Sequence, residues 1–358
     1  MQYFTEVRGG KQNYFLGAGA SKADGAPLQA ELFKAYVNSL SCSFNLDYHN
    51  RYHKTKRNVF AYFADFFGID IEAAITNNQV NNISFPTFEE ALGILDLAIS
   101  KNERYKACGS ELQNIRTSLV FSMAAAIQYQ LDFTDHNRPE HHRKLISQLE
   151  SSLLNKDIVL VSTNYDLLAD NAILHIGADC DYGFECPSTS SSRSIRLLKI
   201  HGSLNWLFCP VCKHIQISNG QKSMINATLN PNGSRCCVCR AAQRSVIVPP
   251  TYYKDMSNPY LQRVYELTEQ ELLSAKEIIF CGYSFPDADM HIKYLLKRSE
   301  QNSNRNEPLK IKIINHGNNP EEKNRYLRFF RDKTDVHYFE NASFEDFANN
   351  PNQFFNAV

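Results

Sequence analysis

One stretch decides the fold of this chain: residues 13–21, which read NYFLGAGAS, followed by the tripeptide GAP at residues 25–27. The apolar run breaks abruptly into glycine, alanine and serine, a pattern typical of a buried strand that ends in a tight turn. Small side chains in such a turn let backbone amides approach a phosphate closely. The stretch therefore predicts a nucleotide-binding turn, although its spacing is not the complete Gly-x-Gly-x-x-Gly fingerprint.

The composition narrows the classes of partner. Lys and Arg together number 38, as do Asp and Glu, so the net charge is zero and no global field attracts nucleic acid or acidic membranes. The N-terminal residues MQYFTE carry neither a basic segment nor an apolar signal core, and no apolar run reaches membrane-spanning length. We therefore expect a soluble, cytoplasmic protein, whose 358 residues exceed one ordinary domain.

Helical periodicity begins after the first turn and continues to residue 154. Within this segment Thr87 and Glu90 have the spacing of a capping box, and the apolar residues after them recur on one helical face. We interpret residues 28–154 as a helical insertion between the first strand and the second.

Apolar strands then alternate with helices, which favours a parallel sheet covered on both faces. Strands are expected at residues 157–161, 197–200, 245–248, 278–281, 311–314 and 336–339, and helices at 262–276, 291–299, from 320 and from 343. The predicted fold class is α/β, a Rossmann-like doubly wound parallel sheet with a large helical insertion and a small zinc-binding module. Its predicted parts are the first strand and turn (1–27), the helical insertion (28–154), the continued Rossmann-like domain (155–205), the zinc module (206–245) and the completed Rossmann-like domain (246–358).

Four of the ten cysteines have the spacing of a metal site. Cys209 and Cys212 form one C-x-x-C knuckle, and Cys236 and Cys239 form a second, in which Cys237 is an alternative ligand. Four thiolates suit tetrahedral zinc and leave no open position, so the predicted role of the metal is structural. The alternative is a set of free thiols in a loop.

Polar residues follow two of the expected strands. Asn164 and Asp166 come after residues 157–161, and His201 comes after residues 197–200. Alternate residues of an extended backbone point to the same side, so an amide, a carboxylate and an imidazole are expected to converge. The alternatives are turn capping by Asn164 and Asp166 and a structural role for His201.

The ordered motifs resemble those of the sirtuins: GAGAS at 17–21, TNYD at 163–166, HG at 201–202, two C-x-x-C knuckles, GYS at 282–284 and IN at 314–315. The resemblance covers both ends of the chain but not the helical block, and it implies a Rossmann-like NAD domain with a zinc module. It also implies site residues. By this resemblance Ala18, Gly19 and Ser21 would hold the pyrophosphate, Ser284 and Asn315 the adenosine half, Asn164 the nicotinamide ribose and Asp166 the carboxamide, and His201 would be the general base.

Two departures put protein deacylation in doubt. Sirtuin deacylases typically continue the Gly-Ile-Pro segment with an acidic residue and then Phe-Arg, whereas Leu28, Gln29 and Ala30 stand here. The Phe-Gly-Glu segment that pairs with an acyl-lysine peptide is replaced by VPPTYY at residues 248–253. In these respects the chain looks more like the sirtuin-like NAD hydrolases of prokaryotic antiviral defence. That likeness suggests regulation, a homo-oligomer, and a partner such as a hexameric ATPase or another defence protein.

The chemistry of NAD cleavage agrees with this set of residues. Nicotinamide in NAD is already cationic, so its bond to ribose breaks without the general acid that an ordinary glycoside requires. An Asp and an Asn hold the carboxamide and stabilise the developing oxocarbenium ion, and a His takes the proton of the acceptor. With no peptide bound, water is the acceptor and the products are nicotinamide and ADP-ribose. The alternatives are an NAD-dependent protein deacylase and a non-catalytic subunit that binds NAD or ADP-ribose.

Overall fold

The computed structural model describes residues 11–40, 49–103, 109–133, 140–184, 193–217, 235–248, 257–302, 307–317, 319–330 and 334–355. The chain divides into two compact units. The first contains residues 1–26, 136–203 and 256–358, and the second contains residues 27–135 and 204–255.

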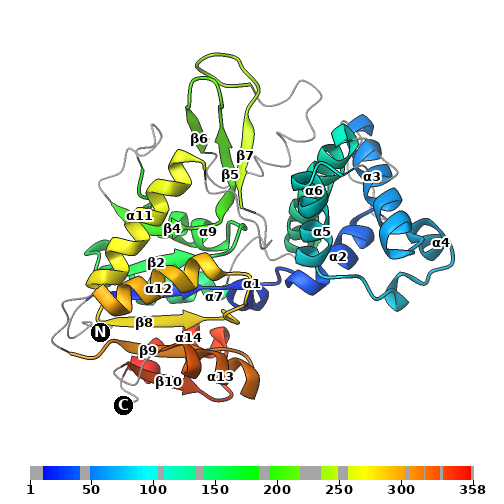
Figure 1. Cartoon of the computed structure of the whole chain (residues 1–358). Coiled ribbons are helices and arrows are strands. Elements are labelled where there is room, and N and C mark those ends of the chain that lie inside the picture. Colours follow the sequence, from blue (N-terminus) through cyan, green and yellow to red (C-terminus); the bar gives the residue numbers. More distant parts are fainter. Residues whose placement is uncertain are drawn as a thin grey trace. The chain divides into compact units, whose positions relative to one another are not determined.

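A seven-stranded sheet forms the centre of the first unit (Figure 1). Its strand order is β10-β9-β8-β1-β2-β4-β3, and every described pair of neighbours is parallel. The strands are β1 (Gln12–Leu16), β2 (Ile158–Ser162), β3 (Asp179–Asp181), β4 (Ser194–Lys199), β8 (Glu277–Cys281), β9 (Lys310–Ile314) and β10 (Asp335–Phe339).

The central strand β1 is completely buried, as a strand covered on both faces must be. Its residues Gln12–Leu16 lie opposite Ile158–Ser162 of β2 on one side and Glu277–Cys281 of β8 on the other. The chain first builds the sheet outward through β2 and β4 and later outward through β8, β9 and β10. This reversal beside β1 is the topological switch point, where the carboxyl ends of the strands leave a crevice for a ligand.

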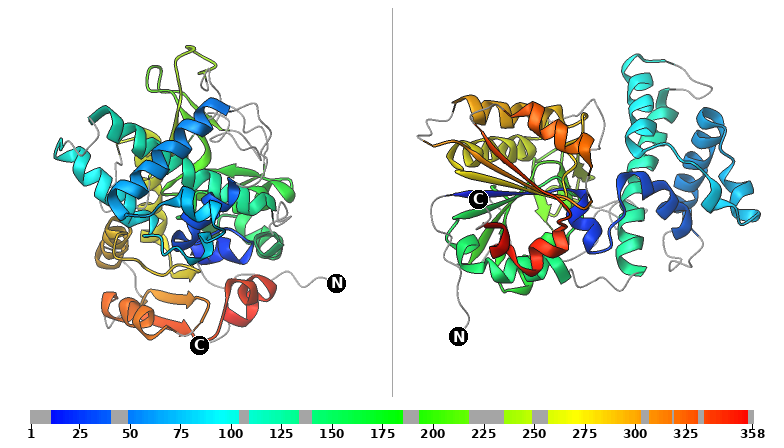
Figure 2. Two further views of the ribbon diagram at one scale, coloured as in Figure 1. Left: turned by 90° about the vertical axis from the view of Figure 1, so that its right-hand side faces the viewer. Right: turned by 90° about the horizontal axis from the view of Figure 1, so that it is seen from below.

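Helices cover both faces of this sheet (Figure 2). Helices α11 and α12 pack together, and α7 packs against both α9 and α14. The helices of the first unit are α1 (Ala18–Ala23), α7 (Glu140–Gln148), α8 (Glu150–Leu154), α9 (Leu168–His175), α11 (Pro259–Ser274), α12 (Met290–Asn302), α13 (Pro320–Phe329), α14 (Phe344–Asn349) and α15 (Pro351–Phe355).

A carboxylate at the end of α1 holds the start of α7. Asp24 accepts hydrogen bonds from the backbone amides of His141 and His142, both at 3.0 Å, and from Nδ1 of His142 at 2.5 Å. Burial acts to raise the pKa of Asp24, but the hydrogen bond and charge of His142, together with the two amides, bring the pKa below its usual value. A residue shortly before the helical segment is therefore hydrogen-bonded to the first residues of the helix that follows it.

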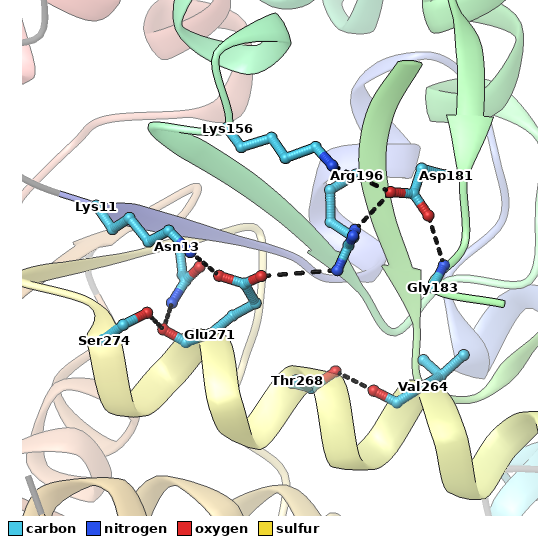
Figure 3. Close-up of polar contacts among 10 residues, drawn as sticks. All are labelled: Lys11, Asn13, Lys156, Asp181, Gly183, Arg196, Val264, Thr268, Glu271 and Ser274. Carbon is cyan, nitrogen blue, oxygen red and sulfur yellow. Dashed lines mark hydrogen bonds and ion pairs between the residues drawn. The ribbon is translucent and has the colours of Figure 1, made fainter.

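Helix α11 is tied to the sheet by the carboxylate of Glu271 (Figure 3). This carboxylate pairs with Lys11 at 2.7 Å and with Arg196 of β4 at 3.7 Å, while the backbone carbonyl of Glu271 accepts a hydrogen bond from Asn13. Arg196 also pairs with Asp181 of β3 at 2.8 Å. These ion pairs and the Asn13 hydrogen bond together connect β1, β3 and β4 to α11.

The second unit contains a helical part and a three-stranded sheet of order β6-β5-β7 (Figure 1). Helix α6 packs against α2, α3 and α5, and the edge of the Phe33 ring meets the ring of Phe63 at 4.7 Å between centroids. The elements are η1 (Gln29–Glu31), α2 (Leu32–Ser39), α3 (His49–Phe67), α4 (Ile71–Thr76), η3 (Val80–Asn82), α5 (Phe88–Ser100), α6 (Gly109–Phe133), β5 (Gly202–Phe208), β6 (Ile215–Ile217) and β7 (Arg244–Ile247).

The predicted fold class is confirmed: a parallel α/β sheet, a large helical region and a small cysteine-bearing sheet are all present. The capping box of Thr87 and Glu90 is also present.

One strand differs from the expectation, since β7 belongs to the small sheet and not to the parallel one. Helices α7 and α8 lie in the first compact unit, although helical periodicity runs unbroken to residue 154. Residues 249–253 lie outside the described residues, and no described helix is long and apolar enough to cross a membrane.

Glycines bring the loops after β1 and β8 into backbone contact. The Gly17 amide donates to the Cys281 carbonyl at 2.9 Å, and the Gly19 amide donates to the Gly282 carbonyl at 2.7 Å. A Cβ atom on Gly282 would lie 2.1 Å from the Ala20 nitrogen, and the φ of Gly282 is +61°. Only a residue without a side chain fits this position.

This contact predicts that Gly282→Ala is far more destabilising than a matched change. Gly177 has a similar φ of +72° but no atom near the position of an added Cβ, so Gly177→Ala carries only the cost of the left-handed conformation, about 1–2 kcal/mol. Gly282→Ala adds a backbone clash to that cost and should lower the melting temperature measured by circular dichroism much further. Equal melting temperatures for the two variants would contradict the close approach.

Candidate functional site

Three of the predicted site residues are joined by hydrogen bonds at the carboxyl ends of β1 and β2. Asn164 donates from Nδ2 to the Gly17 carbonyl and to Oγ of Ser21, both at 2.8 Å. Ser21 in turn donates from Oγ to Oδ2 of Asp166 at 2.7 Å. All three side chains are buried. The chain of bonds fixes the direction of the amide, because both protons of Nδ2 are used.

The loop after β2 supplies this geometry. The backbone amide of Asn164 donates to Oγ of Ser162, the last residue of the strand, at 3.1 Å. Oδ1 of Asp166 accepts from the amide of Leu168, where α9 begins, at 3.0 Å. Asp166 therefore does two things: it caps the helix start, as the turn-capping alternative expected, and it also reaches Ser21 with its other oxygen.

His201 lies beside the same loop. Its Nδ1 is 3.2 Å from the carbonyl oxygen of Thr163, the neighbour of Asn164 in the sequence. A carbonyl oxygen only accepts, so the proton of the neutral ring lies on Nδ1, and Nε2 is the nitrogen with a lone pair. The side chain is buried, and the Tyr165 ring stacks 6.1 Å away between centroids. The structure thus brings His201, Asn164 and Asp166 together.

A buried ion pair contacts the segments that follow β2 and β4. The Lys199 ammonium lies 3.0 Å from Oδ2 of Asp170, and it also donates to the Asp166 carbonyl at 2.5 Å and to Oγ of Ser203 at 2.7 Å. Both charged side chains are only about one per cent exposed. Because Lys199 contacts the loop of Asp166 and the turn that carries His201, this residue sets their separation.

The residues expected at the adenosine and pyrophosphate end lie in α1, directly after β1, and on the loops after β8 and β9. Ala18 and Ser284 are exposed, whereas the Gly19 amide is engaged by the Gly282 carbonyl. Asn315 is buried, and its Nδ2 donates to the Tyr283 carbonyl at 2.8 Å and to the Glu322 carboxylate. Among the described residues, nothing donates a hydrogen bond to Oδ1 of Asn315. That buried acceptor is suited to a donor on a ligand.

The four predicted cysteines form one cluster. The Sγ atoms of Cys209, Cys212, Cys236 and Cys239 all lie within 4.8 Å of one another, with 3.4 Å between Cys209 and Cys239 and 3.5 Å between Cys212 and Cys236. These distances suit tetrahedral zinc, whose bonds to sulfur are about 2.3 Å. Cys237 is exposed, and its sulfur faces Nε2 of His214 at 3.4 Å, so the cluster uses Cys236 and Cys239.

The two knuckles have the same backbone. Lys213 and Arg240, each directly after the second cysteine of its knuckle, have φ of +63° and +64°. Each donates its amide to the carbonyl of the first cysteine, at 3.0 and 2.9 Å. The backbone amides of Cys212 and Val211 lower the pKa of Cys209 to about 6, because they stabilise its thiolate. The amides of Cys239 and Val238 also lower the pKa of Cys236.

Two residues beside the site were not predicted to act in it. His291, at the start of α12, faces His201 with its Nε2, and Asp289 lies 3.8 Å from the same nitrogen of His201. The sequence shows both residues only as part of a polar loop before a helix, where an acidic residue is common. Lys199 was interpreted only as part of an apolar strand. A lysine inside such a run was the available signal of a buried charge.

The buried pair predicts a large loss of stability for Lys199→Met. Removing the ammonium leaves the Asp170 carboxylate buried without its cation, which typically costs about 3–5 kcal/mol. Chemical denaturation followed by tryptophan fluorescence measures this difference. The matched control is Arg263→Met, which removes one member of an exposed pair and should leave stability nearly unchanged. Similar midpoints for both variants would show that the buried pair is not structural.

Comparison with known proteins assigns part of the chain. Residues 158–334 match the family model of the SIR2-like domain. They include Asn164, Asp166, His201, all four clustered cysteines, Ser284 and Asn315, but not the turn at 17–21. No curated protein matches the sequence.

Among solved structures, Sir2Tm bound to a propionylated peptide is 15% identical, with a TM-score of 0.42, and the match covers 94% of this chain and 90% of that chain. A Sir2 homologue in complex with NAD is 14% identical, with a TM-score of 0.44, over 97% of this chain and 90% of that one. Neither likeness bears on the activity of this chain.

Proposed function

We propose that this chain, whose residues 158–334 match the family model of the SIR2-like domain, is an NAD hydrolase that releases nicotinamide and ADP-ribose. The observation that carries the proposal is the hydrogen-bonded set of Ser21, Asn164 and Asp166 with His201 beside it, at the carboxyl ends of strands that flank the switch point. The roles that the resemblance to sirtuins implies for these residues are part of the proposal.

The leaving group needs little help. Nicotinamide departs as a neutral base from a cation, so the enzyme's task is to orient the carboxamide and stabilise the positive ribose. Asp166 supplies the negative charge, and the Asn164 amide presents its oxygen because both Nδ2 protons are held by Gly17 and Ser21. His201 accepts a proton at Nε2 from the water or from a ribose hydroxyl, which takes the place of His291 at that nitrogen, since Nδ1 holds its proton against the Thr163 carbonyl.

The adenosine half would extend toward the loops after β8 and β9. Oδ1 of Asn315, to which no described residue donates, accepts a hydrogen bond from the nucleoside. The exposed Ala18, at the start of α1, and the exposed Ser284 lie on segments that the Gly17, Gly19 and Gly282 contacts hold together. The Gly19 amide already donates to the Gly282 carbonyl. Gly19 would therefore contribute to pyrophosphate binding by its lack of a side chain, which lets the pyrophosphate come close to the backbone.

Water is proposed as the acceptor in place of an acyl-lysine peptide. The support is in the sequence: Leu28, Gln29 and Ala30 replace the acidic residue and Phe-Arg of the deacylases, and Leu28 is exposed. Because uncontrolled hydrolysis of an essential cofactor harms the cell that makes the enzyme, we also propose that activity is regulated. The antiviral-defence role, the homo-oligomer, and the ATPase or other partner suggested by the resemblance belong to this proposal.

We propose that the cysteine cluster binds structural zinc. The donor set fits: four Sγ atoms from two knuckles of similar backbone converge, and backbone amides favour the thiolate form of Cys209 and Cys236. With four protein ligands zinc would staple the small sheet and supply no catalytic chemistry.

Nicotinamide release from NAD alone tests the hydrolase. Wild-type protein should release it without any peptide, and His201→Ala should lower turnover by about 10²–10⁴-fold, the usual contribution of a general base. Asn164→Ala should lower it by about 10²–10³-fold. His337→Ala, an exposed histidine of β10, is the matched control and should keep wild-type turnover.

Three results would contradict the assignment. Unchanged turnover in folded His201→Ala would remove the proposed base. Nicotinamide release that requires an acylated peptide would favour the deacylase. Calorimetric binding of NAD with no turnover, in the presence of the candidate partners as well, would favour the non-catalytic subunit.

Zinc removal should act on stability and not on the site. Cys209→Ser is expected to lose the cysteine-bound zinc and lower the melting temperature, because metal binding contributes directly to folding. Cys237→Ser is the matched control and should retain both zinc and stability, since Cys237 lies outside the cluster. Metal analysis by mass spectrometry together with thermal unfolding measures both. Loss of zinc from Cys237→Ser would mean that the ligand set is wrong.

A further inference from the structure

A second group of metal-ligand side chains lies at the proposed base. Nε2 of His201 and Nε2 of His291 face each other at 2.8 Å, and Oδ1 of Asp289 lies 3.8 Å from the first of them. The ligand atoms of the three residues all lie within 4.8 Å of one another. His201 and Asp289 are buried and His291 is half-buried, so this is not an exposed acidic cluster.

The two facing nitrogens point at one common position, which either a hydrogen or a metal ion can occupy. Without a metal, His291 donates its Nε2 hydrogen to the lone pair on Nε2 of His201 across 2.8 Å, since His201 carries its own hydrogen on Nδ1. Two histidines and one carboxylate are the ligand set of three-ligand zinc sites that keep an open position.

The surroundings of this group have the features of a metal site. A histidine ligand almost always donates its other ring N–H to a carbonyl or carboxylate, and His201 donates from Nδ1 to the Thr163 carbonyl. A ligating carboxylate is itself hydrogen-bonded, and Oδ2 of Asp289 accepts from the Tyr283 hydroxyl at 2.8 Å, which leaves Oδ1 directed at the histidines. His291 is also held in place, because its backbone carbonyl accepts from the Tyr265 hydroxyl.

We propose that His201, Asp289 and His291 bind one divalent transition-metal ion such as Zn²⁺, and that this ion switches the enzyme off. The metal takes the lone pair of Nε2 that His201 needs as a base, and His291 loses its Nε2 hydrogen to solvent and gains one at Nδ1, so that both rings bind the metal as neutral imidazoles. The inhibition part of this proposal rests on the proposed NAD hydrolysis, whereas the metal-binding part does not depend on it.

Equilibrium dialysis against Zn²⁺ tests binding without reference to activity. The full-length wild-type chain should bind two zinc ions, one at the four cysteines and one at this site. His291→Gln keeps a side-chain amide that hydrogen-bonds to His201 but offers no ligand nitrogen, so it should bind one zinc ion, and Asp289→Asn should lower the affinity of the second site by at least about ten-fold. The matched control, His337→Gln, should bind two.

Inhibition is measured on the same proteins. Added zinc should suppress nicotinamide release by wild type and by His337→Gln, and His291→Gln should resist the same concentration. A wild-type chain that binds one zinc ion, or a folded His291→Gln that binds two, overturns the metal site. Two bound ions without any NAD turnover would leave the site in place and refute only the proposed hydrolase.

Discussion

The close approach of the loops after β1 and β8 is the constraint on which the first unit depends. Gly17 and Gly19 donate backbone hydrogen bonds to Cys281 and Gly282, and the amide of Gly282 donates to Ile314 at the end of β9. Three consecutive strand ends are therefore joined by main-chain bonds with no side chain between them. These bonds bring the start of α1, and with it Ser21, to the position where Asn164 and Asp166 reach it.

Buried polar groups of the first unit share hydrogen-bond and ion-pair partners. Lys199 neutralises Asp170 and also binds the Asp166 carbonyl and Ser203, so that one ammonium bridges two loops. A buried pair of this kind contributes little net stability compared with apolar packing, but it specifies which groups meet. We attribute the convergence of the β2 and β4 ends to these contacts of Lys199.

Most of the fold, and which cysteines form the cluster, could be predicted from the sequence. Continuous apolar runs such as residues 158–161 and 278–281 are typical of strands covered on both faces, and the cysteine spacing predicted the cluster because each knuckle is local in sequence. Strand β7 was placed in the wrong sheet because its short apolar run carries no information on its pairing partner. His291 was missed since it meets His201 across 90 positions of the chain. Contacts of that range depend on the topology of the sheet and leave no periodic pattern.

The clamp of Asp24 on the first residues of α7 has a consequence for how this chain is assembled. Asp24 before the helical segment and His141 and His142 after it lie within hydrogen-bonding distance, and no strand of the parallel sheet is interrupted between them. This is the attachment of a domain inserted in a surface loop, which evolution lengthens, shortens or exchanges without altering the host. The helical segment is thus an insertion that can be replaced, and related chains are free to carry different insertions on the same parallel sheet.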